Sequence, residues 1–555
     1  MTEFQKRTFD IFRQLNAIPR PSHHEERVAD FLCDYARGLE LEYERDAQNC
    51  VVIRKPASPG CEGAETIVLL NHMDMVAVGD GSRPFDPLHD GVEAYIEDGW
   101  MKARGTSLGA DNGIGLSMAL AVLACEDLVH GPLEVLTTTN EEDGMSGAAS
   151  MSPDFIKGRR VINLDSEDYD TITVGAAGAY LQKATFAFCP APSIASAASP
   201  AEQAASPAEQ VASPAEQAAS PAEQVASSTP IQEAPPAMAA TPAPGGAVFF
   251  EISISGGLGG HSGVDIGKGR ANAIRLLAEL LCACAGELSV ASIDGGSANA
   301  SIPSSCRAVI GVSPEEAEGF EARLRAEFSV MRERFSDGAG LKLEVRAAGG
   351  GTEVRTAGDG TEVRTAGDDA GHFPVLAGRG LLQLITSLPC GVIRMHETLP
   401  GTVMTSNNIG VISTVEGSIC ISCHTRSFSD EEMVGAAEGI SKLFRDAGAG
   451  VEVLMNTPGW QENPDSGFLA LTDATFRDVL GFSPRKVAMH FVLEAGYYVQ
   501  KFPGIQIACI GPRIVEPHST SERVELQTVR DICAVLIELL ARLAAAGPGA
   551  GREDQ

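Results

Sequence analysis

Short apolar runs that alternate with helical patterns constrain the fold of this 555-residue chain more than any other feature of its sequence. Such runs, when bounded by turn residues, are typical of fully buried β-strands. The predicted strands are Val51–Ile53, Thr66–Leu70, Leu133–Thr139 and Arg160–Leu164 in the first part of the chain and Ile505–Ile510 near its end. Helical patterns between or after them, such as Gly113–Cys125 and Val529–Leu543, predict an α/β fold with a mostly parallel sheet flanked by helices.

The middle of the chain has strands and helices of its own, and we interpret it as an α+β domain inserted into the first domain. This interpretation assigns residues 1–182 and 455–555 to the α/β domain and residues 183–454 to the insertion. Elements expected in the insertion include Val248–Ser255, Ala271–Cys284 and Gly410–Cys423.

Two repeated segments lie within this insertion. Residues 191–246 are mostly Ala, Ser, Pro, Glu and Gln, and Ser-Pro-Ala-Glu-Gln recurs there every seven residues. A period of seven is found in coiled coils, but the proline in each unit and the lack of large apolar residues favour a disordered, extended insert. Within residues 349–369, the unit Gly-Thr-Glu-Val-Arg-Thr-Ala-Gly-Asp occurs twice, which predicts a duplicated surface hairpin or loop.

Composition excludes several classes of function. The chain has 42 Lys and Arg residues against 74 Asp and Glu residues, a formal net charge of −32, which does not fit binding to nucleic acid or to an anionic membrane. The amino end lacks the apolar region of a secretory signal, and the apolar stretch Ile532–Leu540 is too short to span a bilayer. The 13 cysteines are scattered, several of them in apolar runs, which favours free thiols and a cytoplasmic location.

Histidine and acidic side chains follow the predicted strands where each strand ends. They are His72 and Asp74, Glu141 and Glu142, Asp165 and His518, and Asp111 stands at the start of a predicted helix. Because ligands of open α/β sheets bind beyond the carboxyl ends of the strands, we expect these side chains at one edge of the sheet. Each short pair alone is more often a solvated loop feature, but crowded carboxylates repel one another unless a cation offsets them. Two histidines with several carboxylates fit zinc or manganese, and their number fits two metal ions.

Longer motifs resemble the aminoacyl-histidine dipeptidases, also called cytosol non-specific or PepD-type dipeptidases, of the co-catalytic zinc exopeptidase group. The motifs are His72-Met73-Asp74, residues 103–115, Glu141-Glu142, residues 163–167, residues 259–263, residues 405–410, Arg426-Ser427, Pro458-Gly459-Trp460, Gly511-Pro512 and Pro517-His518-Ser519. The resemblance covers nearly the whole chain except the two repeated segments. It implies a zinc-exopeptidase-like fold in which the inserted domain is a lid that also pairs protomers into a homodimer.

The resemblance also implies roles for the candidate residues. The implied ligands of two divalent ions are His72 and Asp165 at one site, Glu142 and His518 at the other, and Asp111 bridging both. Zinc is the expected metal, with manganese or cobalt as alternatives. Glu141 would be the general base for a metal-activated water, and Asp74 would fix the tautomer of His72.

Four further residues are candidates for contacts with the substrate. His261 would support the oxyanion, although a histidine flanked by glycines is otherwise a turn residue. Arg426 would bind the terminal carboxylate, with a surface ion pair as the alternative. Asn408 would hydrogen-bond the substrate backbone, and Glu494 is a candidate partner for a free amino group. The family pattern His-Ala-Gly-Leu-Glu is His-Phe-Val-Leu-Glu at residues 490–494 here, which leaves the substrate preference open.

The function predicted from these residues is two-metal hydrolysis of dipeptides, Xaa-His and others, with broad specificity. One alternative is an amidohydrolase of the same fold that acts on N-acyl amino acids. Another is a non-catalytic scaffold that uses the Ser-Pro-Ala-Glu-Gln repeats as its interaction surface. A scaffold would not need an intact site, whereas Glu141 and all five candidate ligands are present.

Overall fold

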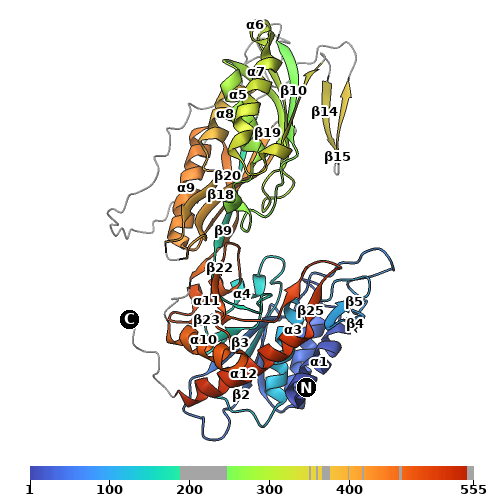
Figure 1. The fold of residues 1–555 in the computed structure, drawn as a ribbon, viewed down its shortest axis with the longest axis vertical. Helices are drawn as coiled ribbons and strands as arrows, with labels where there is room; N and C mark the ends of the chain where they lie inside the picture. Colours follow the sequence, from blue (N-terminus) through green and yellow to red (C-terminus); the bar gives the residue numbers. More distant parts are fainter. Residues whose placement is uncertain are drawn as a thin grey trace, which may run out of the picture.

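The computed structural model describes residues 1–187, 247–348, 352–357, 360–365, 376–397, 399–415, 418–461 and 466–546. The insert predicted at 191–246 and parts of the 349–369 segment lie outside these residues. Figure 1 shows two lobes. The lower lobe contains the amino-terminal part of the chain (blue) and its carboxyl-terminal part (red), and the upper lobe contains the middle of the sequence (green to orange).

A nine-stranded sheet forms the centre of the lower lobe. Its strands are β1 (Glu42–Arg45), β2 (Val51–Lys55), β3 (Ile67–His72), β6 (Leu133–Thr138), β7 (Arg160–Asn163), β8 (Thr171–Ala176), β21 (Trp460–Gln461), β22 (Arg485–Met489) and β23 (Gln506–Cys509). The order is β1-β2-β6-β3-β7-β23-β8-β21, with β22 paired to β8. The central strands β6, β3, β7 and β23 are parallel, whereas β1, β2 and β21 pair antiparallel. The five strands predicted from the sequence are confirmed to within two residues.

Helices cover both faces of this sheet. On one face the core contains residues of α1 (Glu3–Asn16), α2 (Glu26–Gly38), α3 (Ala110–Ala124), α10 (Gly467–Leu480) and α12 (Leu526–Ala545), and on the other those of α4 (Ser146–Ser150) and α11 (Ala495–Lys501). Successive side chains of a strand point to opposite faces, so Ile67 and Leu69 pack in the first core and Val68 and Leu70 in the second. The predicted α/β fold class is therefore confirmed.

The upper lobe contains a separate antiparallel sheet of ten strands. They are β9 (Gly178–Ala187), β10 (Val248–Ser255), β11 (Leu288–Gly295), β12 (Cys306–Val312), β13 (Lys342–Ala348), β16 (Leu376–Ala377), β17 (Gly391–Met395), β18 (Val403–Val415), β19 (Ser418–Ser427) and β20 (Gly450–Thr457). The main order is β13-β10-β12-β11-β18-β19-β9-β20. Residues of α5 (Ala273–Cys284), α7 (Phe320–Met331), α8 (Gly378–Ser387) and α9 (Asp430–Asp446) share one hydrophobic core with this sheet. The segment predicted at 410–423 is not one element. It covers the end of β18 and the start of β19, which pair with each other antiparallel.

The duplicated nine-residue unit forms a two-stranded antiparallel sheet beside the upper lobe (Figure 1). Each copy supplies one strand, β14 (Thr352–Ala357) and β15 (Gly360–Thr365), and Val354 lies opposite Val363. These residues form the paired strands that a hairpin requires, and the duplicated hairpin or loop at 349–369 as a whole stays a prediction.

The chain passes from the lower sheet to the upper one between Ala176 and Gly178 and returns between Thr457 and Trp460. These crossings lie close to the boundaries predicted at 182/183 and 454/455, and the domain boundaries themselves stay a prediction. Within the described part of the chain, no helix is long and apolar enough to cross a membrane, and all twelve of its cysteines are free thiols.

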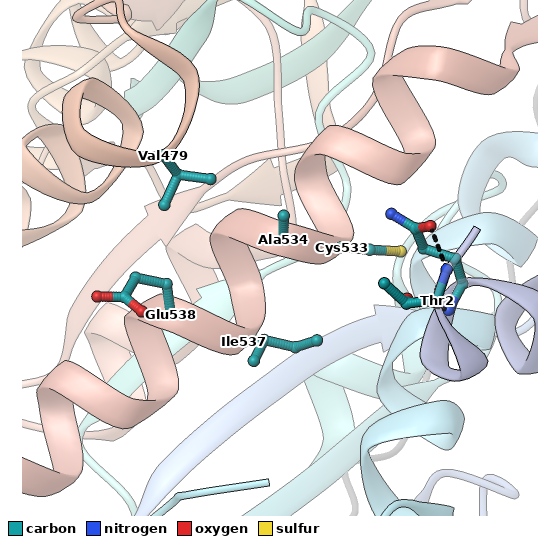
Figure 2. Close-up of a pocket in the computed structure, with 7 residues that line it drawn as sticks. Thr2, Val479, Cys533, Ala534, Ile537 and Glu538 are labelled. Carbon is teal, nitrogen blue, oxygen red and sulfur yellow. Dashed lines mark hydrogen bonds between the residues drawn. The ribbon is translucent and has the colours of Figure 1, made fainter.

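Figure 2 shows a cavity of about 320 Å³ in the lower lobe, between the amino-terminal end of α1 and one side of α12. Its lining residues are Thr2, Gln5, Val479, Cys533, Ala534, Ile537 and Glu538. None of these is a candidate ligand or substrate residue.

Candidate metal centre and substrate site

The sheet brings the predicted metal ligands together from segments far apart in the sequence. His72 is the last residue of β3, and Glu142 and Asp165 follow the neighbouring parallel strands β6 and β7. Asp111 lies in the first turn of α3, and His518 lies between two short strands, β24 (Ile514–Val515) and β25 (Arg523–Glu525). The parallel register aligns the carboxyl ends of the strands, which explains the convergence.

Asp111 lies between the two histidines and directs one carboxylate oxygen toward each. His72 Nε2 is 3.0 Å from Asp111 Oδ1 and 3.4 Å from Asp165 Oδ1. His518 Nε2 is 3.2 Å from Asp111 Oδ2 and 2.8 Å from Glu142 Oε2. Ligand atoms of His72, Asp111 and Glu142 lie within 4.8 Å of one another. The five side chains thus form one cluster with Asp111 at its centre.

The chemistry of this cluster fits a pair of divalent transition-metal ions. Two imidazoles and three carboxylates are donors that zinc, manganese and cobalt accept. Glu142 Oε1 is buried and has no hydrogen-bond partner among the described residues. A buried carboxylate oxygen without a donor is costly unless a cation reaches it.

Most side chains of the cluster have pKa values shifted toward their protonated forms. Hydrogen bonds to Asp111 and Glu142 raise the pKa of His518 to about 11. Burial would lower the pKa of His72, but the charge of Asp165 and hydrogen bonds to three carboxylates raise it well above its usual value. Burial also raises the pKa of Asp165 to about 7 and raises that of Glu142. Metal ions would have to displace protons from these groups in order to bind.

Asp74 lies beside the ring of His72 and binds the turn that carries the two adjacent glutamates. Its side chain is fully buried, and Oδ1 lies 3.3 Å from His72 Nδ1. The backbone N–H groups of Glu141 and Glu142 donate to its two oxygens at 3.1 and 3.2 Å, and Ser22 Oγ donates at 2.8 Å. The structure therefore brings Asp74 close to the ring of His72 and adds a contact to the Glu141-Glu142 turn, and the orienting role of Asp74 stays a prediction.

The two glutamates of that turn have different surroundings. The carboxylate of Glu142 contacts His518. Burial raises the pKa of Glu141 well above its usual value, the charge of His72 lowers it, and the charges of Asp165, Glu142 and Glu494 raise it further. Glu141 is thus a carboxyl group beside the cluster, in a setting that favours its protonated form.

Glu494 is a buried carboxyl group at the amino-terminal end of α11. Its Oε2 accepts hydrogen bonds from Thr138 Oγ1 at 2.8 Å and from the Tyr498 hydroxyl at 3.4 Å, and its Oε1 has no hydrogen-bond partner among the described residues. Burial raises its pKa to about 8. The charge of His72 lowers this pKa, and the charge of Asp165 raises it. Glu494 thus lies beside the cluster with one oxygen unengaged.

Arg426 is a buried cation in β19, close to the junction of the lobes. It is 3% exposed, and its Nε and Nη1 have no hydrogen-bond partners within the described part of the chain. Burial lowers its pKa to about 10, and its charge helps to lower the pKa of His261, His424 and His490. Because the guanidinium is not on the surface, the alternative of a surface ion pair does not describe it.

His261 follows a pair of glycines in the upper lobe. Its Nδ1 accepts hydrogen bonds from the backbone N–H groups of Gly263 and Val264, both at 3.2 Å, so the neutral ring carries its proton on Nε2. Burial and the charge of Arg426 lower its pKa. The edge of the Phe491 ring packs against it, with 6.3 Å between ring centroids.

Asn408 is engaged with protein groups. Its Nδ2 donates to the carbonyl groups of Ser301 at 2.7 Å and Asn299 at 3.4 Å, and its Oδ1 accepts from Asn272. These bonds hold the loop that leads from β11 to β12. A contact with the substrate backbone stays a prediction.

Two buried charged residues beneath the cluster, Arg20 and Glu522, were not predicted from the sequence. Both are at most 3% exposed, and both bind backbone groups of the segments that carry the candidate ligands. The signal that could have found Glu522 is the helix end near Asp111, whose N-cap residue Gly109 has no side chain to cap it.

The chain is similar to known peptidases. Residues 68–544 match peptidase family M20/M25/M40. The chain is 30% identical over 543 residues to the cytosol non-specific dipeptidase of Escherichia coli strain K12, covering 97% of each chain. The crystal structure of aminoacylhistidine dipeptidase from Vibrio alginolyticus is similar with a TM-score of 0.76 and 27% identity, covering 99% of this chain and 98% of that one. A tripeptidase from Staphylococcus aureus shares the fold alone, with a TM-score of 0.50 and 14% identity over 98% of this chain and 99% of that one.

Proposed function

Because the chain belongs to peptidase family M20/M25/M40, we propose that it is a two-metal dipeptidase of broad specificity that accepts Xaa-His among other dipeptides. It is a metallopeptidase homologous to the cytosol non-specific dipeptidase, as the sequence motifs predicted. The observation that carries the substrate proposal is the pair of buried groups with unengaged atoms, Glu494 beside the metal cluster and Arg426 at the lobe junction.

Asp111 would contribute a ligand to each of two metal sites. His72 and Asp165 would complete one site, and Glu142 and His518 the other. The distances from each histidine to its carboxylates support this division. Divalent ions, zinc or alternatively manganese or cobalt, would supply Lewis acidity that lowers the pKa of water and polarises the scissile carbonyl.

Glu141 would act as the general acid and base of the reaction. Burial raises the pKa of Glu141 above the usual range of a glutamate, which supports this role because a more basic carboxylate accepts a proton more readily. Glu141 would take a proton from the attacking water and return it to the leaving amine. Asp74, which binds the backbone N–H of Glu141, would keep this carboxyl group in register with the ring of His72.

Recognition of both ends of the substrate would limit its length. The free amino group would approach Glu494, and the terminal carboxylate would form a charge-assisted pair with Arg426. The loop at residues 490–494 contacts the upper lobe at one end and carries Glu494 at the other. His490 Nε2 lies 2.8 Å from Ser406 Oγ of the upper lobe, and Glu494 is the last residue of the loop. Asn408 would contact the substrate backbone.

His261 would donate from Nε2 to the oxyanion that develops on the scissile carbonyl. A lowered pKa supports this role, since a neutral imidazole keeps the Nε2 proton available while Nδ1 accepts backbone bonds.

We also propose a homodimer formed through the upper lobe and a cytoplasmic location. The name of the Escherichia coli relative, a cytosol dipeptidase, and the free thiols of the described residues support that location.

Paired substitutions of the adjacent glutamates test the mechanism. Glu141→Gln keeps the shape but cannot accept a proton, so kcat should fall about 10²- to 10⁴-fold with both metal ions retained. Glu142→Gln, the matched control, should weaken one metal site, and raising the metal concentration should recover part of the turnover. The measurements are kcat and metal stoichiometry across a metal titration.

A panel of dipeptides, tripeptides and N-acyl amino acids tests the substrate class. Dipeptides should be hydrolysed with zinc, manganese or cobalt, and a chelator should abolish hydrolysis. Faster hydrolysis of N-acyl amino acids would favour an amidohydrolase instead. Reversed effects of the two glutamate substitutions would exchange their roles, and no effect of either would refute the hydrolase proposal.

A further inference from the structure

Arg20 and Glu522 join the three segments that carry His72, Asp111 and His518, and we propose that this pair positions the bridging carboxylate of the metal centre. Neither residue belongs to the ligand cluster, so each would act through Asp111 as a positioning residue. The inference rests on the proposed two-metal function.

Glu522 binds the backbone at the amino-terminal end of α3. Its Oε2 accepts hydrogen bonds from the N–H groups of Leu108 at 2.8 Å and Gly109 at 2.9 Å. Its Oε1 accepts from Ala110 at 2.7 Å and from Asp111 at 3.4 Å. The first N–H groups of a helix have no partner within the helix, and here no side chain at the N-cap position supplies one. A carboxylate from the distant His518 segment serves as the cap.

Arg20 ties the same turn to the end of β3. Its Nη1 donates to the carbonyl groups of Met73 at 3.1 Å and Asp74 at 3.0 Å. Its Nη2 donates to the carbonyl group of Gly109 at 2.6 Å. Burial lowers the pKa of Arg20, while the charges of Glu522 and of carboxylates in the cluster raise it. The guanidinium thus contributes a positive charge beneath the carboxylates.

Two glycines leave room for this guanidinium. A Cβ atom at Gly109 or at Gly113 would lie 2.6 Å from Arg20 Nη2. Gly109 also has a φ of 66°, which favours glycine. Gly109 and Gly113, which precede and follow Asp111, therefore make room for the Arg20 guanidinium. The backbone N–H groups of the same turn bind Glu522.

The consequence is a fixed direction for the Asp111 carboxylate. One of its oxygens faces His72 and the other faces His518, so a small rotation of the turn would misplace it toward both sites. Arg20 fixes the turn relative to His72, and Glu522 fixes it relative to His518. Residues that orient metal ligands typically contribute 10- to 100-fold to metal affinity or activity.

Glu522→Gln tests this role with Glu525→Gln as the matched control. Glutamine keeps the size of the side chain but loses the charge and directs N–H donors at backbone N–H groups. Metal affinity, measured on metal-free protein titrated with Zn²⁺ or Co²⁺, should fall about 10- to 100-fold for at least one ion. The visible absorption of the Co²⁺-loaded protein should change as well. Glu525 lies three residues further on and faces Arg513, so its substitution should leave affinity and spectrum as in the parent.

Arg20→Lys is the second variant. Lysine keeps the charge but offers a single nitrogen that cannot span the carbonyl groups of both segments, so it should also weaken metal binding. If Glu522→Gln does not fold, as judged by circular dichroism without metal, Arg20→Lys decides. Parental affinity and an unchanged Co²⁺ spectrum in the folded variants would refute the positioning role and leave the proposed function standing. A parent protein that binds no divalent ion would refute both.

Discussion

Replacing Glu494 by glutamine should change how the stability of the metal-free protein depends on pH. Glu494 is 1% exposed and receives hydrogen bonds from Thr138 and Tyr498. Burial raises its pKa from an ordinary value of 4.5 to about 8. The folded protein therefore prefers the protonated carboxyl group, whereas the unfolded chain ionises it above a pH of about 4.5.

The sign of the effect follows from this raised pKa. The stabilisation is complete below the pKa of the unfolded chain and is lost as the pH rises through the pKa of the folded protein. At about 1.4 kcal/mol per pKa unit, the full shift corresponds to about 5 kcal/mol in the free energy of unfolding. Roughly half of this falls between pH 5 and pH 7. Glutamine does not ionise, so the variant lacks this contribution to the slope.

Urea unfolding followed by tryptophan fluorescence measures the difference. Both tryptophans of the chain, Trp100 and Trp460, lie in strands of the lower lobe, so the signal reports the lobe that contains Glu494. The comparison uses metal-free proteins, because bound metal would stabilise the folded state by mass action. Parent and variant should diverge steadily in unfolding free energy from pH 5 to pH 8, with the parent losing more. Parallel pH profiles would refute the burial argument for Glu494.

Two further predictions concern substrate and metal binding. Arg426→Met should lower kcat/KM for free dipeptides about 10- to 100-fold, since a hydrogen bond to a charged group contributes about 1.5–3 kcal/mol. Parent and variant should hydrolyse dipeptide amides, which lack the terminal carboxylate, equally. An equal loss on both substrates would contradict carboxylate recognition. Metal binding at pH 7 should release protons, because His518, with a pKa of about 11, and His72, with its raised pKa, must lose their protons to become ligands. Calorimetry in two buffers with different heats of ionisation should show this release, with affinity rising from pH 6 to pH 8, whereas identical heats in both buffers would contradict it.

Much of the lower lobe could be predicted from the sequence because its central strands are buried on both faces. Such strands are continuous apolar runs, and Thr66–Leu70 and Leu133–Thr139 differ from β3 and β6 by two residues or fewer at each end. Polar side chains directly after a run then fall at the edge of the sheet, so His72 and Glu142 could be placed there. No comparable rule marks the ends of the strands in the upper lobe. Its long strands β18 and β19 have aliphatic and small residues at their adjoining ends, so the predicted segment 410–423 included parts of both strands.

The contacts of Asp74 show a second limit. Its pairing with His72 could be predicted because both residues lie in one short motif. Its bonds to the backbone of Glu141 and Glu142 could not be predicted, because an N–H donor is present at nearly every residue and leaves no trace in the sequence.

The same limit applies to Glu522, which lies 411–414 residues from the four N–H groups that it binds. Charged side chains are mostly exposed, so an isolated glutamate is expected on the surface. The informative signal was on the other side of the contact. In the structure, helix α3 begins at Ala110, and neither its N-cap residue Gly109 nor the preceding Leu108 has a side chain that can cap it. A buried helix end still needs acceptors for its first N–H groups, so the missing cap required an acceptor from elsewhere in the fold. A carboxylate meets that need best, because it accepts several hydrogen bonds and its charge favours the positive end of the helix.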